Sequence, residues 1–588
     1  MAMLYAVFGV FAAATMVSVT MTMASSTLRQ AQSHARSGRV QYLAEGAVES
    51  AKRDVATAIA NWLPPPTSGS ATIDGVVVPY TVTATGFNDI ATDAAGIQTI
   101  VTGYEIRADA LENGMRHTAR RLVNAEATPI FQFAVFYTGD LEVNPGPNMT
   151  LAGRVHSNSN MYLNCGGTLT LNTNYVRAVG EILRRRKDDP SASQGNVRAR
   201  RWVVNPFNTT EPVNYVVMRS HTQMNNLGVD NESGYDSAFK SGWDAGGDGS
   251  FADAGDWYSW SAGAPLYWSQ PSTYSGGAGS TVLSGVHGVK QAAVPHIGSI
   301  QMFETDPNGA YFFDPSTGTY ELAAGGAGTH SPGYYHQNAG LSIITLADGT
   351  IQAFDGSGND ITADLAAAIS PASVYDARQA QGASGSIPLT EIDLGALAAT
   401  PHWPDNGLIY AAHYGAGQGT DAKGVRLVNG SQLASALTVV SENSVYVQGD
   451  FNTVNKKGAA VIADAVNLLS NNWNDSKAAG GSLPAATQTT YNLAIVTGNT
   501  NTVEGGQYNG GLENLPRFHE NWSGVVCRIT GSFVNTWTSE YASNNWMIGG
   551  NYYNAPTRNW SYDPAFNSVA NLPPFTPMAV TAVDVCAW

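Results

Sequence analysis

The pattern of apolar and polar residues changes character three times along the chain. Met1–Leu28 contains no charged side chain, and the first cation is Arg29. From there to Trp62 apolar residues recur at spacings of three and four, the period of a helix with one apolar face. The members of that face are Val40, Leu43, Ala44, Ala47, Val48 and Ala51. The pattern predicts one helix over Met1–Trp62, roughly 90 Å long at about 1.5 Å per residue. Three prolines from Pro64 would end it.

One part of this helix, Thr15–Thr22, is dense in hydroxyl and β-branched residues. Such side chains restrict χ1 or compete for backbone hydrogen bonds. We therefore expect the helix to loosen there once it leaves lipid. The alternative is a regular helix whose Ser and Thr hydroxyls bond back to their own turn.

Three interpretations compete for Met1–Leu28. A cleaved secretory signal would carry a basic n-region, which this segment lacks. A transmembrane anchor followed by Arg29, Arg36 and Arg39 would place the large remainder in the cytoplasm by the positive-inside rule. The third and favoured interpretation is the exposed N-terminal helix of a subunit that packs into a bundle, its short basic leader already removed.

Residues 67–128 change to strand-like alternation. The segments Gly75–Thr85, Thr99–Ala108 and Arg116–Ala125 read as strands separated by turns. After a long helix, this pattern predicts a small antiparallel sheet packed on the apolar face of that helix.

After Phe131, short apolar runs such as Ala459–Ile462 and Leu493–Val496 recur between Asn, Gly and Asp residues, without a fixed period. A parallel β-helix-like body is preferred, with a β-sandwich as the alternative. The predicted fold class is therefore α+β. Its parts are a long helix over 1–63, with 1–28 apolar, a small sheet over 64–128 and a large β-rich extracellular body over 129–588.

Composition supports such a body and limits its partners. Only 13% of the 588 residues are charged and 62 are glycine, which is typical of a turn-rich all-β protein. The net charge of −16 argues against nucleic acid as the main partner. The three cysteines form no disulfide framework. Either Cys527 pairs with Cys586 and leaves Cys165 over, or all three are buried thiols.

A basic run stands out in this acidic chain. It is a candidate docking patch for an acidic partner such as the next copy of the chain, and a solvated loop is the alternative. Its members are Arg184, Arg185, Arg186 and Lys187, with Arg198, Arg200 and Arg201 nearby.

Two acidic stretches place oxygen ligands at short intervals, as Ca²⁺ sites do. Neither matches an EF-hand loop, so they are weak calcium candidates beside ordinary polar turns. They comprise Asp355, Asp360 and Asp364 in one stretch and Asp244, Asp248, Asp253 and Asp256 in the other. No other cofactor is expected, because the histidines and cysteines form no zinc signature.

No catalytic residues are expected either, because the chain contains no nucleophile elbow and no phosphate loop. The densest polar cluster, Arg517–Trp522, contains acid, base and cation types. It is interpreted as a β-structured turn held by an Arg517–Glu520 pair rather than as an active site.

The segment Tyr42–Ala51, YLAEGAVESA, resembles the "YLAEAGxExA" stretch on the N-terminal helix of type IV pilin-like proteins of the large minor-pilin and pseudopilin branch. Segments of the body are similar to the long C-terminal regions that accompany this helix: Gly139–Glu142, Gly153–Asn158, Val445–Asn452, Ala463–Trp473 and Gly510–Asn514. The resemblance implies a non-enzymatic subunit held in the inner membrane. It would then join a helical homo-oligomeric filament at the cell surface through its N-terminal helix.

The residues expected to carry that assembly lie along the helix: Met1, Tyr5, Phe8, Phe11, Val17, Val19, Leu28, Leu43 and Val48. One departure from the family concerns how neighbouring subunits are placed in register along the filament. Most pilins have an acidic residue near the mature N-terminus that pairs with a neighbour's terminal amine. Here Tyr5 takes that place, and no acid precedes Glu45.

Two other classes of function stay open. One is a tethered β-helix enzyme acting on polysaccharide. The other is a tip adhesin that binds surface carbohydrate, with the aromatic residues between Trp243 and Trp268 as its platform.

Overall fold

The computed structural model divides the chain into two compact units, which are described separately. The first, the head unit, comprises Met1–Ala91, Thr99–Ala127 and Val580–Trp588, and the second, the body, comprises Thr92–Gln98 and Thr128–Ala579. The described residues are 1–60, 65–93, 96–173, 175–189, 194–200, 289–302, 333–379, 386–418 and 421–587, with Gly285 and short strands between 215 and 322.

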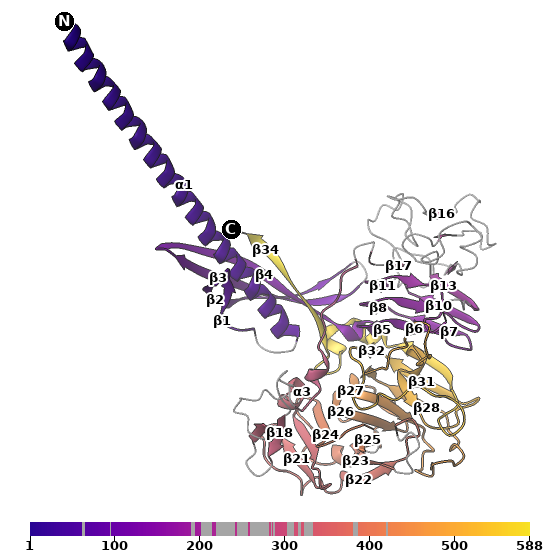
Figure 1. Cartoon of the computed structure of the whole chain (residues 1–588). Helices are drawn as coiled ribbons and strands as arrows, with labels where there is room; N and C mark the ends of the chain where they lie inside the picture. Colours follow the sequence, from indigo (N-terminus) through magenta and orange to yellow (C-terminus); the bar gives the residue numbers. More distant parts are fainter. Residues whose placement is uncertain are drawn as a thin grey trace. The chain divides into compact units, whose positions relative to one another are not determined.

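Helix α1 runs without a break over Ala2–Ala60 (Figure 1). The hydroxyl of Thr15 donates to the Phe11 carbonyl at 2.9 Å, and those of Thr20 and Thr22 donate to carbonyls four residues before them. The expected loosening over Thr15–Thr22 is therefore wrong for this chain. Each of these hydroxyls is satisfied within its own turn, so it does not draw the backbone into another conformation.

The head unit is an antiparallel sheet on the second half of α1. Its strands are β1 (Ser68–Ile73), β2 (Val76–Thr92), β3 (Gln98–Glu112), β4 (Met115–Pro129) and β34 (Met578–Ala587), in the order β1-β2-β3-β4-β34. The three strands expected from the sequence are confirmed and are longer than expected. Because β34 joins this sheet, the chain returns to the head at its C-terminal end. The boundary that assigned all of 129–588 to the body misses this return.

The apolar face predicted for the helix forms the core of the head. Its residues and Val55 pack against apolar side chains of β2, β3 and β4, including Val78, Ile106 and Val123. A Cβ placed on Gly46 would lie 2.5 Å from Ile73 Cδ1, so the helix lies close on β1. At the margins, Arg39 Nε lies 2.8 Å from Glu112 Oε2 and Arg121 Nη1 lies 2.6 Å from Glu49 Oε1.

The body begins with stacked coils of three short strands. The first coil contains β5 (Val135–Tyr137), β6 (Leu141–Val143) and β7 (Met149–Ala152). The second coil contains β8 (Val155–Ser157), β9 (Met161–Leu163) and β10 (Thr168–Asn172). The third coil contains β11 (Val176–Ala178), β12 (Ile182–Leu183) and β13 (Asn196–Arg200). Equivalent strands pair in parallel, as Val135 with Val155 and Val155 with Val176. The first coil therefore takes 20 residues and the second 21. Parallel pairing between successive coils is the arrangement that the preferred β-helix-like interpretation describes.

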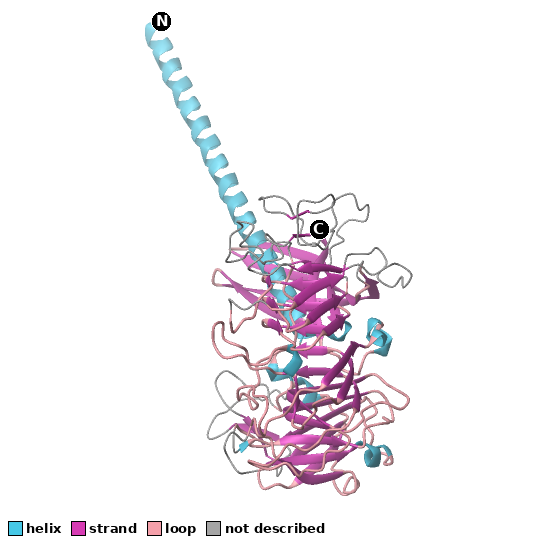
Figure 2. Cartoon of the chain, turned by 90° about the vertical axis from the view of Figure 1, so that its right-hand side faces the viewer, coloured by secondary structure: helices cyan, strands magenta, loops and turns pink. Residues whose placement is uncertain are grey.

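A second set of strands extends one of these ladders. Its main members are β20 (Leu341–Thr345), β24 (Leu408–His413), β26 (Leu437–Gln448), β27 (Ala459–Leu469), β29 (Ala494–Thr497) and β32 (Phe533–Asn535). The order β17-β11-β8-β5-β32-β29-β27-β26-β24-β20-β21 makes one sheet, in which β32 pairs in parallel with β5. Figure 2 shows these strands stacked along the body. The chain thus closes its C-terminal strands onto its first coil.

Shorter elements complete the described parts of the body. They are β14 (Tyr215–Met218), β15 (Gly242–Trp243), β16 (Trp257–Tyr258), β17 (Val282–Leu283), β18 (Tyr311–Asp314), β19 (Thr319–Leu322), α3 (Tyr334–Gln337), β21 (Ile351–Asp355), β22 (Ile369–Val374), β23 (Ile387–Asp393), α4 (Leu394–Ala398), β25 (Gly424–Val428), β28 (Thr489–Asn492), β30 (Pro516–Phe518), β31 (Val526–Gly531) and β33 (Thr557–Tyr562).

The core of the body is continuous along these strands. Every residue of β27 is buried, as expected of a parallel strand covered on both faces. Cys165 and Cys527 are free, buried thiols. The pairing of Cys527 with Cys586 is therefore wrong, and burial raises the pKa of the Cys527 thiol far above its usual value.

Leu43→Ala should loosen the head, because Leu43 is fully buried between α1 and the sheet. Removing such a side chain costs about 2–5 kcal/mol of stability. We expect faster hydrogen exchange of the β3 and β4 amides, measured by mass spectrometry on the full chain. Tyr42→Ala, an exposed neighbour on the same helix, is the matched control. Equal protection of the head strands in the two variants would contradict this account of the core.

Candidate assembly interface

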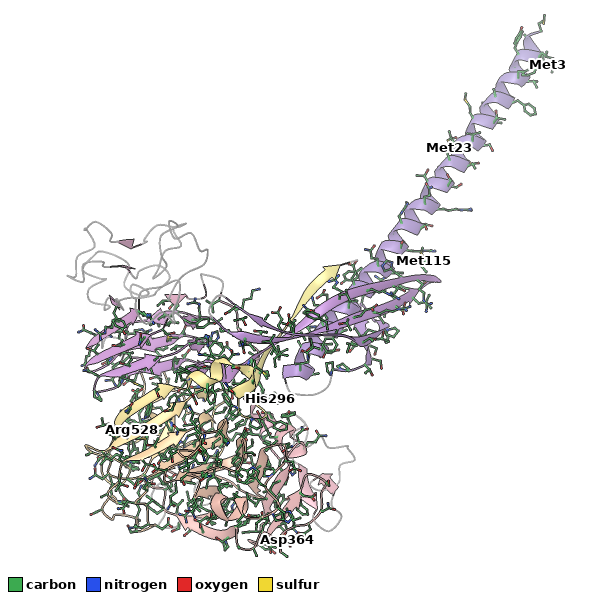
Figure 3. The ribbon with its side chains drawn as sticks, turned by 180° about the vertical axis from the view of Figure 1, so that it is seen from behind. Met3, Met23, Met115, His296, Asp364 and Arg528 are labelled. Carbon is green, nitrogen blue, oxygen red and sulfur yellow. The ribbon has the colours of Figure 1, made fainter. Side chains whose placement is uncertain are left out.

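The first 39 residues of the helix project from the head with their side chains exposed. Figure 3 shows Met3 and Met23 on this free segment. Its large apolar residues are Met1, Met3, Leu4, Tyr5, Val7, Phe8, Val10, Phe11, Met16, Val17, Val19, Met21, Met23 and Leu28. By length and composition, α1 is the one described helix apolar enough to cross a membrane, with a mean hydropathy of 2.0 over its most apolar window.

The structure separates the expected assembly residues into two groups. Seven are exposed by 53–95%: Met1, Tyr5, Phe8, Phe11, Val17, Val19 and Leu28. Leu43 and Val48 are fully buried in the head core, so their assignment to assembly is wrong. They carry the same apolar pattern as the free segment, but the chain's own sheet already covers them.

The change from free to covered helix falls at Arg39 and Val40. Arg39 is exposed and is held to the head by Glu112 and, at 3.9 Å, by Asp74. Val40, the next residue, is buried. The candidate interface is therefore the free segment, Met1–Arg39, in which Met1–Leu28 carries no charge and exposes many large apolar side chains.

The basic run is not a docking patch. Arg184, Arg185 and Lys187 are buried, and Arg184 donates to the carbonyls of Gln194 and Gly195 at 2.7 Å each. Arg185 pairs with Glu504 at 2.5 Å, Lys187 with Asp140 at 2.9 Å, and Arg186 with Asp188. Burial lowers the pKa of Arg184 to about 10, which leaves it charged at neutral pH. These cations hold turns of the coils together.

The first group of calcium candidates serves its own turns. Asp355 Oδ1 accepts the backbone N–H groups of Ser357 and Asn359 at 2.9 Å, and Asp360 Oδ1 accepts that of Thr362 at the same distance. Asp364 lies 3.2 Å from His402. Among the residues described, no group of three or more His, Cys, Asp or Glu is placed to hold a metal. Calcium binding stays a prediction.

Two further expectations fall in segments of which little is described. The second acidic stretch, Asp244–Asp256, lies outside the described residues. So do the side chains of the aromatic platform between Trp243 and Trp268. Carbohydrate binding there stays a prediction.

The polar cluster over Arg517–Trp522 is buried except for Asn521, and the expected Arg517–Glu520 pair is wrong. Glu520 accepts from the Ser470 backbone N–H at 2.7 Å, whereas Arg517 Nη2 donates to the Ala542 carbonyl at 2.8 Å. His519 Nε2 lies 2.9 Å from Asn467 Oδ1. Burial lowers the pKa of His519 to about 4, so it is neutral at pH 7. Partners distant in the sequence replace the local one.

Two carboxyl groups escaped sequence reasoning, half-buried Glu442 and buried Asp464, although each interrupts an apolar strand. Glu442 Oε2 accepts the Met302 N–H at 2.8 Å, and burial, then the charges of Glu540 and Asp464, raise its pKa to about 7. Asp464 accepts the N–H groups of Glu540 and Ala542 at 2.5 and 2.8 Å. Burial raises the pKa of Asp464 to about 6.

Comparisons with known proteins add little to this geometry. No protein-family model matches the chain, and no curated protein matches it. Among solved structures, the chain is similar to the competence-associated pilin ComZ from Thermus thermophilus, with 10% identity and a TM-score of 0.19. That match covers 93% of this chain and 97% of the other. A TM-score this low carries no argument about fold or function.

Glu442→Gln should change how stability depends on pH. The native pKa is raised from 4.5 to about 7, so the native state holds this proton more tightly than the unfolded state. The stability that it contributes is complete below about pH 4.5 and is lost as pH rises through 7. The free energy of unfolding of the variant should therefore rise by about 2 kcal/mol relative to that of wild type as pH increases from 5 to 8.

Thermal unfolding of the full chain across that pH range measures the effect. Glu181→Gln, at an exposed carboxyl in the same body, should follow wild type. A Glu442→Gln difference that stays constant with pH would show that Glu442 does not titrate as described.

Proposed function

We propose that this chain is a non-enzymatic structural subunit of a type IV pilus-like extracellular filament, assembled through the free segment of α1. The observation that carries the proposal is the fully exposed apolar surface of Met1–Leu28, on a helix whose second half is built into a folded head. An uncharged helix that exposes so many large apolar side chains needs lipid or other helices around it. The resemblance of Tyr42–Ala51 to the pilin-like helix supports the same conclusion.

The apolar side chains of the free segment can be covered first by membrane lipid and then by the helices of a filament. Fully burying a large apolar side chain away from water is worth about 1.5–3 kcal/mol, and the segment exposes fourteen of them, so water is the unfavourable choice. Lipid tails and apolar helices cover the surface about equally well, so passage between them depends on close packing. Gly9 and Ala12–Ala14 supply the small side chains that allow helices to approach. A subunit stored in the inner membrane can thus enter a filament without passing through water.

In this proposal, neighbouring subunits are placed in register without the usual ion pair. No carboxyl side chain precedes Glu45, and Tyr5 is exposed with its hydroxyl at the far end of the helix. Shape matching along the apolar surface therefore sets the axial position of neighbours. In this proposal the body forms the outer surface of the filament at the cell surface.

Phe8→Arg should abolish filaments while leaving the head and body folded. The substitution places a charge in the middle of an apolar surface, where lipid or neighbouring helices would have to cover it. Electron microscopy of sheared surface fractions measures filament number, and circular dichroism of the purified full chain checks the fold.

Val503→Arg is the matched control. Val503 is 72% exposed in the body and Phe8 is 71% exposed on the helix, so the two substitutions disturb the isolated chain equally. The control should assemble as wild type does. Filaments of normal number from Phe8→Arg, or from a chain lacking Ala2–Leu28, would refute assembly through this helix.

A further inference from the structure

The body contains a small cavity beside β30 with room of about 20 Å³, enough for one ion or one water molecule. Its wall is formed by polar and aromatic side chains that are distant in the sequence. They are Arg378, Asn514, Arg517, Phe518, His519, Trp546, Met547, Tyr552 and Tyr553.

Three hydrogen-bond donors of this wall are buried without a protein partner: Arg378 Nη2, Arg517 Nη1 and Asn514 Nδ2. The same side chains are held firmly by their other atoms. Arg378 Nε donates to the Asn544 carbonyl at 2.9 Å, and Arg517 Nη2 donates to that of Ala542 at 2.8 Å. Asn514 Oδ1 accepts from the Tyr553 hydroxyl, which orients the amide. Buried donors that lack partners are rare in folded proteins, so an occupant of the cavity is expected.

The charge of the wall indicates which occupant fits. It carries two guanidinium groups and no carboxylate. Burial, and then the charge of Arg517, lower the pKa of Arg378, because like charges face each other in a dry site. The histidine of the wall, His519, is neutral at pH 7. A water molecule would satisfy the donors but would leave this repulsion in place.

The nearby carboxylates are committed to other partners. Asp376 accepts the N–H groups of Arg378 and Gln379 and the hydroxyl of Tyr446. Asp464 accepts backbone N–H groups of the segment that follows Ser539. Lys477, another cation near Asp376, donates to the Tyr552 carbonyl at 2.9 Å. The charge of Asp376 favours the charged forms of Arg378 and Arg517, and that of Asp464 favours charged Arg517, but neither carboxylate lines the cavity.

We propose that this cavity binds a single small anion of the size of chloride, held by Arg378, Arg517 and Asn514. The anion accepts the three buried donors and offsets the repulsion between the two arginines. It joins the segment after β22, which carries Arg378, to Asn514 and to strand β30, which carries Arg517. The native body is thus stabilised by halide in solution.

Thermal unfolding of the full chain in detergent at pH 7 tests this site. Sodium chloride is compared at equal ionic strength with sodium gluconate, whose anion is too large for the cavity. Asn514→Asp supplies a carboxylate on the wall with little change of shape. General salt effects act on every variant alike, so the signal is the difference between variants. We expect chloride to raise the midpoint of wild type by roughly 1–3 °C more than that of Asn514→Asp.

Arg528→Gln, at a partly exposed arginine on β31, is the matched control and should respond to chloride as wild type does. Figure 3 labels this residue. Equilibrium dialysis with radiolabelled chloride should give one bound ion per wild-type chain. Absence of bound chloride in wild type would overturn the proposal and leave water in the cavity. An equal chloride response in Asn514→Asp would overturn it by placing the ion elsewhere.

Discussion

The packing of one helix face against the head sheet is the interaction on which the rest of the molecule depends. Val40–Val55 supply an apolar stripe that β2, β3 and β4 cover, while Arg39 and Glu49 are held at its margins by Glu112 and Arg121. Helix α1 is one hydrogen-bonded rod, so anchoring its second half also directs its first half away from the head. The free segment before Arg39 therefore points away from the head without needing any contact of its own with the sheet.

That arrangement creates a surface which the chain cannot cover by itself. The hydroxyls of Thr15, Thr20 and Thr22 are already bonded to helix carbonyls, so an apolar environment does not leave them without partners. A segment that looks unfavourable for a helix is therefore well suited to lipid or to neighbouring helices. The hydroxyls also bring polar character to this stretch without adding charge.

Sequence reasoning succeeded where the pattern is local and failed where partners are distant. Periods of three and four identified the helix and its covered face, and alternation identified three strands of the head. Nothing in the sequence near Met578–Ala587 signals a pairing with β4, more than 400 residues earlier. Leu43 and Val48 were assigned to assembly because apolar periodicity does not say which surface covers a face. The Arg517–Glu520 pair failed for the same reason, because both residues bond across coils.

The buried charges of the body explain why its candidate sites were misread. In a chain with so few charged residues, a basic run or an acid-rich cluster suggests recognition or catalysis. In this fold the turns between coils leave backbone groups unpaired, and buried charged side chains satisfy them. Arg184 donates to two carbonyls, Asp464 accepts from the segment after Ser539, and Glu520 accepts from Ser470. The arginine pair of the cavity departs from this rule, because Arg378 Nη2 and Arg517 Nη1 are buried without a hydrogen-bond partner in the protein. Elsewhere an internal partner satisfies the charged groups named above, whereas in our proposal an ion from solution accepts the free arginine donors.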